Sequence, residues 1–90
     1  MKRIIVKRHG NLERFDERKI YASCYSACIN CSINKLKAEK ICEKASREIK
    51  LWIKNKKQVT SDDLFNKLSK ILNKFDRDAS FMYKTHRDVN

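Results

Sequence analysis

The sequence contains no proline and only one glycine, Gly10, among its 90 residues. Linkers between domains are usually rich in these residues or in serine, so the composition predicts one domain over residues 1–90. A single glycine also excludes the glycine-rich phosphate-binding loops of P-loop and dinucleotide-binding proteins, which need two or three. We therefore expect regular structure along nearly the whole chain.

Long apolar runs are also absent. No segment approaches the roughly 20 residues that span a bilayer, and the N-terminus has no apolar signal core. We therefore expect a cytoplasmic protein, where the four cysteines stay reduced. Three of them follow helical spacing on an apolar stripe, unlike the CxxC knuckles of zinc ribbons. We interpret all four as small buried thiols and expect no metal site: Cys24, Cys28, Cys31 and Cys42.

Positive charge dominates what is present. Lysine and arginine number 22 against 11 acidic residues, which gives a net charge of +11. Such an excess indicates an anionic partner: a nucleotide, nucleic acid, an acidic protein or a membrane surface. A lysine-rich composition can also be a habit of a whole proteome, so charge alone does not choose among these classes.

Apolar periodicity predicts the fold. Two short apolar runs, Ile4–Val6 and Leu12–Phe15, flank Gly10 and Asn11, which tolerate positive φ, and this pattern is typical of a β-hairpin. The period then lengthens to about 3.6 residues. We expect four helices: one that Asp16 caps, one over Asn34–Lys54, one that Ser61 caps after a short extended Val59, and one from about Asp76. The predicted fold is α+β, mainly α, with the hairpin lying on a four-helix cluster.

The first helix begins with an unusual charge pattern. Arg18 and Lys19 lie in its first turn, beside the positive end of the helix dipole, which disfavours cations. An anion held by the free backbone N–H groups, and clamped by Lys19 and by Lys7 or Arg8 of the hairpin, would stabilise this arrangement, and phosphate fits best. The alternative is that both cations are solvated and pair with the nearby carboxylates of Glu13 and Glu17.

Two segments resemble the signatures of the ATP-cone domain family. The first is Val6-Lys7-Arg8-His9-Gly10, followed by Glu13, Phe15-Asp16 and Lys19-Ile20, and the second is Val59-Thr60-Ser61. The resemblance covers essentially the whole chain. It implies a fold of four helices capped by a small three-stranded sheet, with a short strand near Val59. It also implies that the domain binds ATP or dATP as an allosteric effector, with or without Mg²⁺.

The resemblance also implies a nucleotide site. Val6, Lys7 and Arg8 would contact adenine and phosphate, and Glu13 and Asp16 would meet the base, the ribose or metal-bridged groups. The remaining contacts would come from the helices: Lys19 on the phosphates, Ile20 on the base, and Thr60 with Ser61 on the far side.

The chain departs from the family pattern in two ways. The family often has an aromatic residue after the alanine of the last helix, but Ser80 follows Ala79 here, so Tyr83 nearby is a weaker candidate contact. Family members usually precede a ribonucleotide reductase or follow a zinc ribbon, and these 90 residues contain neither.

No catalytic arrangement is evident. His9 and His86 are isolated, and neither a Ser/His/Asp nor a Cys/His pairing can be identified, so we expect a non-enzymatic module that regulates a protein partner or its own association. One alternative is a small basic nucleic-acid-binding regulator, with phosphates tracked by lysines of the second helix and beyond: Lys35, Lys37, Lys40, Lys44, Lys50, Lys54, Lys56 and Lys57. Another is a docking domain that has lost nucleotide binding.

Overall fold

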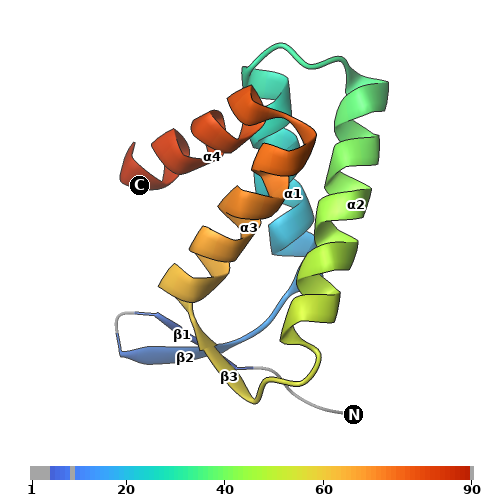
Figure 1. Cartoon of the computed structure of the whole chain (residues 1–90). Helices are drawn as coiled ribbons and strands as arrows, with labels where there is room; N and C mark the ends of the chain where they lie inside the picture. The colour runs from blue at the N-terminus through green and yellow to red at the C-terminus, as the bar shows by residue number, and fades with distance from the viewer. Residues whose placement is uncertain (1–4, 9, 90) are drawn as a thin grey trace.

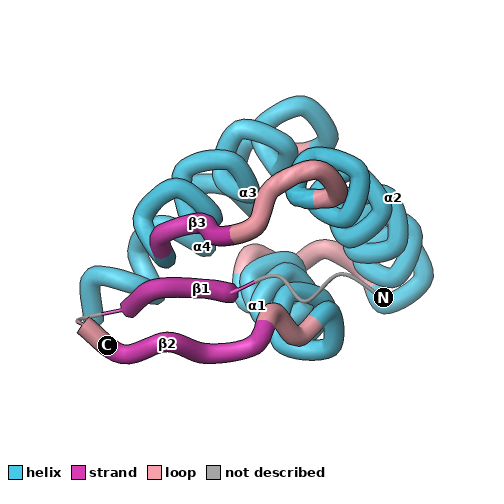
Figure 2. Tube along the Cα trace, turned by 90° about the horizontal axis from the view of Figure 1, so that it is seen from below, coloured by secondary structure: helices cyan, strands magenta, loops and turns pink. Residues whose placement is uncertain are grey.

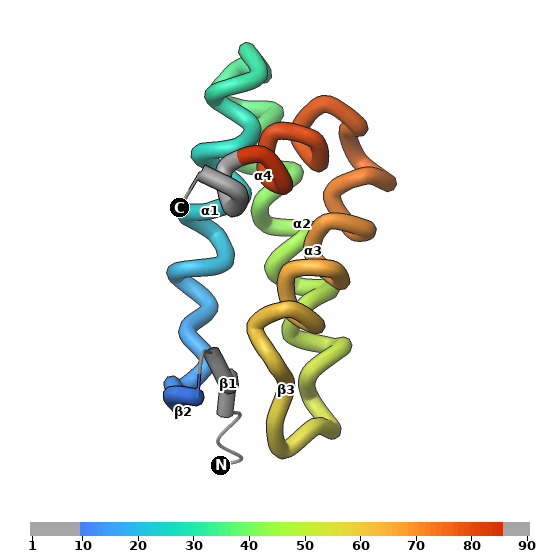
Figure 3. Tube along the Cα trace, turned by 90° about the vertical axis from the view of Figure 1, so that its left-hand side faces the viewer, coloured from blue at the N-terminus to red at the C-terminus, as the bar shows by residue number. Residues whose placement is uncertain are grey.

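The computed structural model describes the backbone of residues 5–8 and 10–89 and the side chains of residues 10–85. Its elements follow in the order β1 (Ile5–Arg8), β2 (Asn11–Arg14), α1 (Glu17–Asn30), α2 (Lys35–Ile53), β3 (Gln58–Thr60), α3 (Ser61–Phe75) and α4 (Arg77–Val89). The strands lie at one end and the helices α1, α2 and α3 extend away from them, as Figures 1 and 3 show. The expected α+β, mainly α class is confirmed. No described helix is both long and apolar enough to cross a membrane.

Local capping explains where the first two helices begin. Asp16 and Asn34 have extended backbones, and their side chains accept from the backbone N–H groups of Arg18 and Lys37, each at 2.9 Å. Each bond satisfies one of the N–H groups that a helix start leaves without a partner. The predicted cap at Asp16 and the predicted second helix are therefore confirmed.

The third helix begins one residue earlier than predicted. The N–H of Asp63 donates to Oγ1 of Thr60 at 2.9 Å, so Thr60 is the cap and Ser61 is the first helical residue. Both residue types cap well, and Thr60 takes the role because it ends β3 in an extended conformation. Strand and helix are therefore joined without a loop. The fourth helix begins at Arg77, and Oδ1 of Asp76 accepts from the N–H of Ala79 at 3.0 Å.

The sheet has the order β2-β1-β3, with β1 antiparallel to β2 and parallel to β3 (Figure 2). Gly10 has a φ of 82°, as the hairpin pattern predicts. Asn11 does not share that conformation, because it is already the first residue of β2 and lies opposite Arg8. The antiparallel register thus places the turn directly after β1.

Two apolar clusters hold the elements together. The larger joins the four helices through fully or nearly fully buried side chains, among them Ile20, Cys24, Cys28, Ala38, Ile41, Cys42, Ala45, Ile49, Leu68, Ile71, Leu72 and Ala79. The smaller fastens the sheet to the end of α2, because Val59 and Ile53 pack with Phe15, Trp52 and Leu64. The sheet is therefore anchored to the helices through β3 and the segment after β2.

The cysteines belong to the larger cluster. Cys24, Cys28 and Cys42 are fully buried, as predicted, whereas Cys31 is only half-buried because it caps the exposed end of α1. Hydrogen bonding with Cys42, followed by burial, raises the pKa of the Cys28 thiol. Hydrogen bonding with Cys24 is the largest cause that raises the pKa of Cys42 to about 12. These groups are neutral thiols that fill space between α1 and α2. Among the described residues, no group of three or more His, Cys, Asp or Glu side chains could hold a metal.

Truncating Ile49 to alanine should lower the free energy of unfolding by about 2–5 kcal/mol, because the fully buried side chain leaves a cavity in the larger cluster. Leu51→Ala on the same helix is the matched control, since 64% of Leu51 is exposed, and it should change stability by less than about 0.5 kcal/mol. Urea unfolding followed by circular dichroism measures both. Equal losses in the two variants would contradict the assignment of the core.

Candidate functional site

The register of the sheet brings three of the predicted segments together. Val6 lies in one row with Glu13 and Val59, and Lys7 lies in the next row with Leu12 and Thr60. β1 is the central strand, and Ile5, Val6 and Lys7 each have a neighbour on both sides. The structure describes the backbone of Val6, Lys7 and Arg8 but not their side chains, so these residues are placed here by strand register alone.

Two helices begin from opposite ends of this sheet. α3 follows Thr60, in the row of Lys7, whereas α1 follows the end of β2 at which Arg14 lies opposite Ile5. The helix start nearer to Lys7 is therefore that of α3. Arg8 lies opposite Asn11, and the five steps along the chain from Asn11 to Asp16 would span about 16 Å if extended. A clamp on the start of α1 by the cations of β1 would have to bridge that length.

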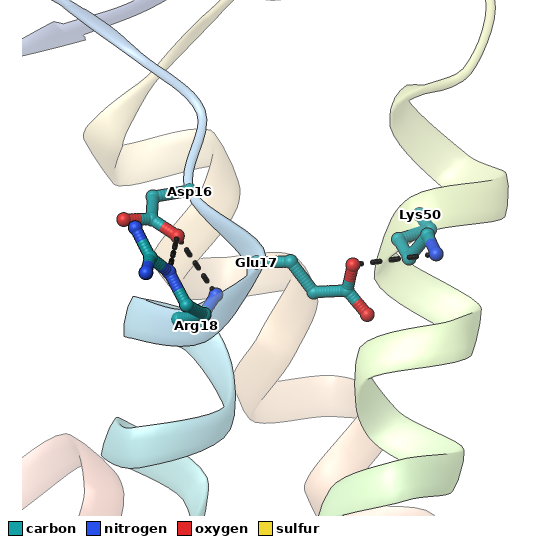
Figure 4. A network of polar contacts seen from close by, with 4 residues as sticks. All are labelled: Asp16, Glu17, Arg18 and Lys50. Carbon is teal, nitrogen blue, oxygen red and sulfur yellow. Dashed lines mark hydrogen bonds and ion pairs between the residues drawn. The ribbon is translucent and has the colours of Figure 1, made fainter.

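The start of α1 already has an anion of its own. The carboxylate of Asp16 accepts from the backbone N–H of Arg18 at 2.9 Å and from its Nε at 3.4 Å (Figure 4). The hydrogen bond from that backbone N–H is the largest of the causes that lower the pKa of Asp16. The charge pattern that suggested phosphate at this helix start is thus balanced by the cap itself.

Glu17 turns away from this cap. Its Oε2 lies 3.3 Å from Nζ of Lys50, so the ion pair links the start of α1 to α2 (Figure 4). Neither Glu13 nor Glu17 is the partner of Arg18 that the solvated alternative required. Within the described residues, the exposed Lys19 forms no ion pair. It is the cation of this turn that remains available to a ligand.

The other predicted helix contacts differ in exposure. Ile20 is 7% exposed and packs in the larger cluster, so only its edge could meet a base. Thr60 is exposed and Ser61 is half-buried at the start of α3. The exposed carboxylates of Asp62 and Asp63 follow in the first turn. The helix dipole stabilises these carboxylates, but carboxylates repel a phosphate. An anion bound at this helix start therefore needs a cation beside it.

Tyr83 has an aromatic neighbour that the sequence reasoning missed. Its ring stacks on Phe65 of α3, with 5.1 Å between ring centroids and 27° between the planes. Phe65 could have been found from its position four residues after Ser61, which is one helical turn. Ser80 is buried and donates from Oγ to the carbonyl oxygen of Ser69 at 2.8 Å. That packing between α3 and α4 explains why this position does not hold the aromatic residue of the family pattern.

Comparison with known proteins gives two matches. The family model described as the ATP cone domain matches residues 3–87. The transcriptional repressor NrdR of Carboxydothermus hydrogenoformans is 32% identical over 91 aligned positions, which cover 97% of this chain and 58% of that protein. The chain therefore spans little more than half the length of this relative. No solved structure matches.

The cap at Asp16 should make stability depend on pH. Its native pKa is lowered from 3.8, so its contribution is present above the unfolded pKa and is lost as pH falls through the native one. We expect the free energy of unfolding to fall below about pH 4. Asp16→Asn, which keeps a neutral cap, should flatten this fall when denaturant unfolding is measured from neutral pH down to about pH 2.

Glu43→Gln, which removes an exposed carboxylate from the middle of α2, is the control for the loss of a negative charge away from a helix start. A profile that Asp16→Asn does not alter would refute the role of this carboxylate at the start of α1.

Proposed function

This chain belongs to the ATP-cone domain family, and from that premise we propose that it binds ATP or dATP as a regulatory effector. The observation that carries the proposal is the sheet register, which sets Lys7 beside Thr60 and Val6 beside Glu13. Two segments far apart in sequence thereby meet in one small sheet next to the start of α3, with neighbouring rows facing opposite sides of it. Cations of β1 and backbone N–H groups at a helix start are the kinds of donor that a triphosphate requires.

The proposed site divides its contacts between base and phosphates. Val6, Lys7 and Arg8 contact the adenine and the phosphates along β1. Lys19 contributes its ammonium group from the start of α1, at the other end of the sheet, so the proposed nucleotide extends along the sheet between the two. Glu13 meets the base or the ribose. The remaining proposed contacts act at the borders of the site: Asp16, Ile20, Thr60, Ser61 and Tyr83. Their packing in the fold supports a positioning role for Asp16, Ile20 and Thr60, because each is also needed for a cap or for the core.

Magnesium has a physical reason to take part. Asp63 places an exposed carboxylate in the first turn of α3, and it would repel an unaccompanied triphosphate. A Mg²⁺ ion carried by the nucleotide offsets this repulsion, because it prefers phosphate and carboxylate oxygens. We therefore propose the magnesium complex of the nucleotide as the ligand.

The proposed role is regulatory and non-catalytic. The NrdR relative is a transcriptional repressor by name, which supports a regulatory function, although this chain spans only 58% of it. In the proposal, the effector acts by shifting an equilibrium of self-association or of contact with a protein partner. Such a shift requires unequal affinity of the nucleotide for the two states.

Lys19→Ala should weaken ATP binding about tenfold or more, because a charged hydrogen bond to phosphate contributes about 1.5–3 kcal/mol. Arg18→Ala is the matched control: it removes the same charge from the same turn, but Arg18 is already held by Asp16, so affinity should change less than about twofold. Isothermal titration with ATP, dATP and ADP in the presence of Mg²⁺ measures these affinities.

Two outcomes would count against the site. Equal losses in Lys19→Ala and Arg18→Ala would indicate attraction by net charge, and unchanged affinity in both Lys19→Ala and Arg8→Ala would remove the site altogether. A thermal shift in the same nucleotide series gives an independent measure, since a ligand stabilises the fold once its concentration exceeds its dissociation constant.

Self-association is the proposed regulatory response that can be measured on this chain without a partner protein. Saturating ATP should raise the average mass measured by sedimentation velocity, and Lys19→Ala should need correspondingly more ATP for the same change. The two titrations must shift together, because binding and association are linked. A mass that stays constant at saturating ATP would rule out self-association as the output.

A further inference from the structure

The outer face of α2 is not covered by the other elements. Its buried residues, such as Ala38, Ala45 and Ile49, turn toward α1 and α3, and the opposite side faces solvent. Figures 1 and 2 show α2 at the edge of the molecule, with β1 and β2 extending on the other side. This outer face is therefore separate from the surface proposed for the nucleotide.

Cations line this outer face at helical spacing. Successive steps of three or four residues, with one step of seven across the exposed Leu51, place five exposed cations in one stripe: Lys37, Lys40, Lys44, Arg47 and Lys54. We call this stripe the basic ridge. At 1.5 Å per residue, the 17 residues between its ends correspond to about 25 Å.

The charge of the basic ridge is not neutralised within the fold. None of its five cations forms an ion pair with any described residue. Two of the acids around α2 are engaged elsewhere, since Glu17 pairs with Lys50 and Glu48 pairs with Lys74. Glu39 and Glu43 are on the flank of the stripe, where Glu43 lies one turn from Lys40 and from Arg47. Lys44 also approaches an aromatic ring, with its Nζ 5.9 Å from the centroid of Phe75.

Like charges one turn apart destabilise a helix by about 0.2–0.5 kcal/mol per pair, so a polyanion would relieve a real repulsion. The chemistry of the ridge narrows the class of polyanion. Its length exceeds that of one triphosphate, and it carries no aromatic residue on which single-stranded bases could stack. Four of the five cations are lysines. A lysine ammonium group contacts phosphate as a point charge, whereas the planar guanidinium of arginine can donate two hydrogen bonds to one base. Duplex phosphates, at about one charge per 1.7 Å of helix axis, match a long straight row of cations.

We propose that the basic ridge of α2 binds the phosphate backbone of duplex nucleic acid without regard to sequence. This surface includes Arg47, which the sequence reasoning left out, and excludes Lys50, whose ammonium group is held by Glu17. The inference does not depend on nucleotide binding, because it uses a different face and different residues.

The test compares two variants that each remove three positive charges. Lys37→Gln, Lys40→Gln and Arg47→Gln remove them from the ridge, and Lys70→Gln, Arg77→Gln and Lys84→Gln remove them from exposed positions on α3 and α4. Fluorescence anisotropy with a short labelled DNA duplex gives affinity against salt concentration for each protein. Circular dichroism and ATP titration, both unchanged in the ridge variant, establish that its fold and nucleotide site are intact.

Five phosphate contacts predict a slope of log affinity against log salt of about −4.5, so the wild type should lose about 500-fold in affinity between 50 and 200 mM salt. The ridge variant should have a slope of about −1.8 and lose only about tenfold over the same range. The control variant should keep a slope within about one unit of the wild type.

Three results would overturn the proposal. Equal effects of the two variants would mean attraction by net charge alone. Tighter binding of a single strand of the same length would exclude the duplex as the preferred partner. Equally tight binding of a polyglutamate peptide, weakened by the same ridge substitutions, would assign the ridge to an acidic protein surface.

Discussion

Parallel pairing of β1 with β3 joins segments that are separated by about 50 residues, and the proposed nucleotide surface exists only where they meet. A strand of three residues is not stable alone, and closing so long a loop costs entropy. The pairing can therefore persist only if α1 and α2 fold back on each other and deliver β3 to the sheet. Val59 and Ile53, packed against Trp52, supply the apolar contact at that point. The proposed site therefore depends on the packing of the helices.

Local patterns predicted the elements well, because their causes are local. The bounds of α2 follow from a cap at Asn34 and an unbroken apolar stripe, and the hairpin follows from Gly10. The start of α3 was displaced because Thr60 and Ser61 are equally good caps, and only the end of β3 decides between them. The direction and register of the pairing between β1 and β3 are not local properties, so the residues alone did not specify them.

The site was less predictable than the fold, for an electrostatic reason. A sequence shows that Arg18 and Lys19 lie against a helix dipole, but it does not show which anion balances them. In the structure, Asp16 supplies that anion through its contacts with Arg18, whereas Lys19 forms no ion pair with any described residue. Sequence likewise counts the lysines of α2 without separating Lys50, which is paired, from the ridge cations, which are not. The partner that each side chain takes, within one turn for Arg18 and across helices for Lys50, decides these cases.

The two proposed anion sites raise the question of how one could sense the other. Direct repulsion between a bound triphosphate and a bound duplex is weak if they lie on different faces, because the Debye length is about 8 Å at physiological salt and the molecule measures 35 by 27 by 18 Å. Any linkage between the two proposed sites must then act through the packing of the helices. α2 would take part in it, since its inner face packs with α1 and α3 and its outer face carries the ridge. Because the interior is close-packed, a shift of either neighbour would move α2 as a rigid body and reorient the whole ridge at once.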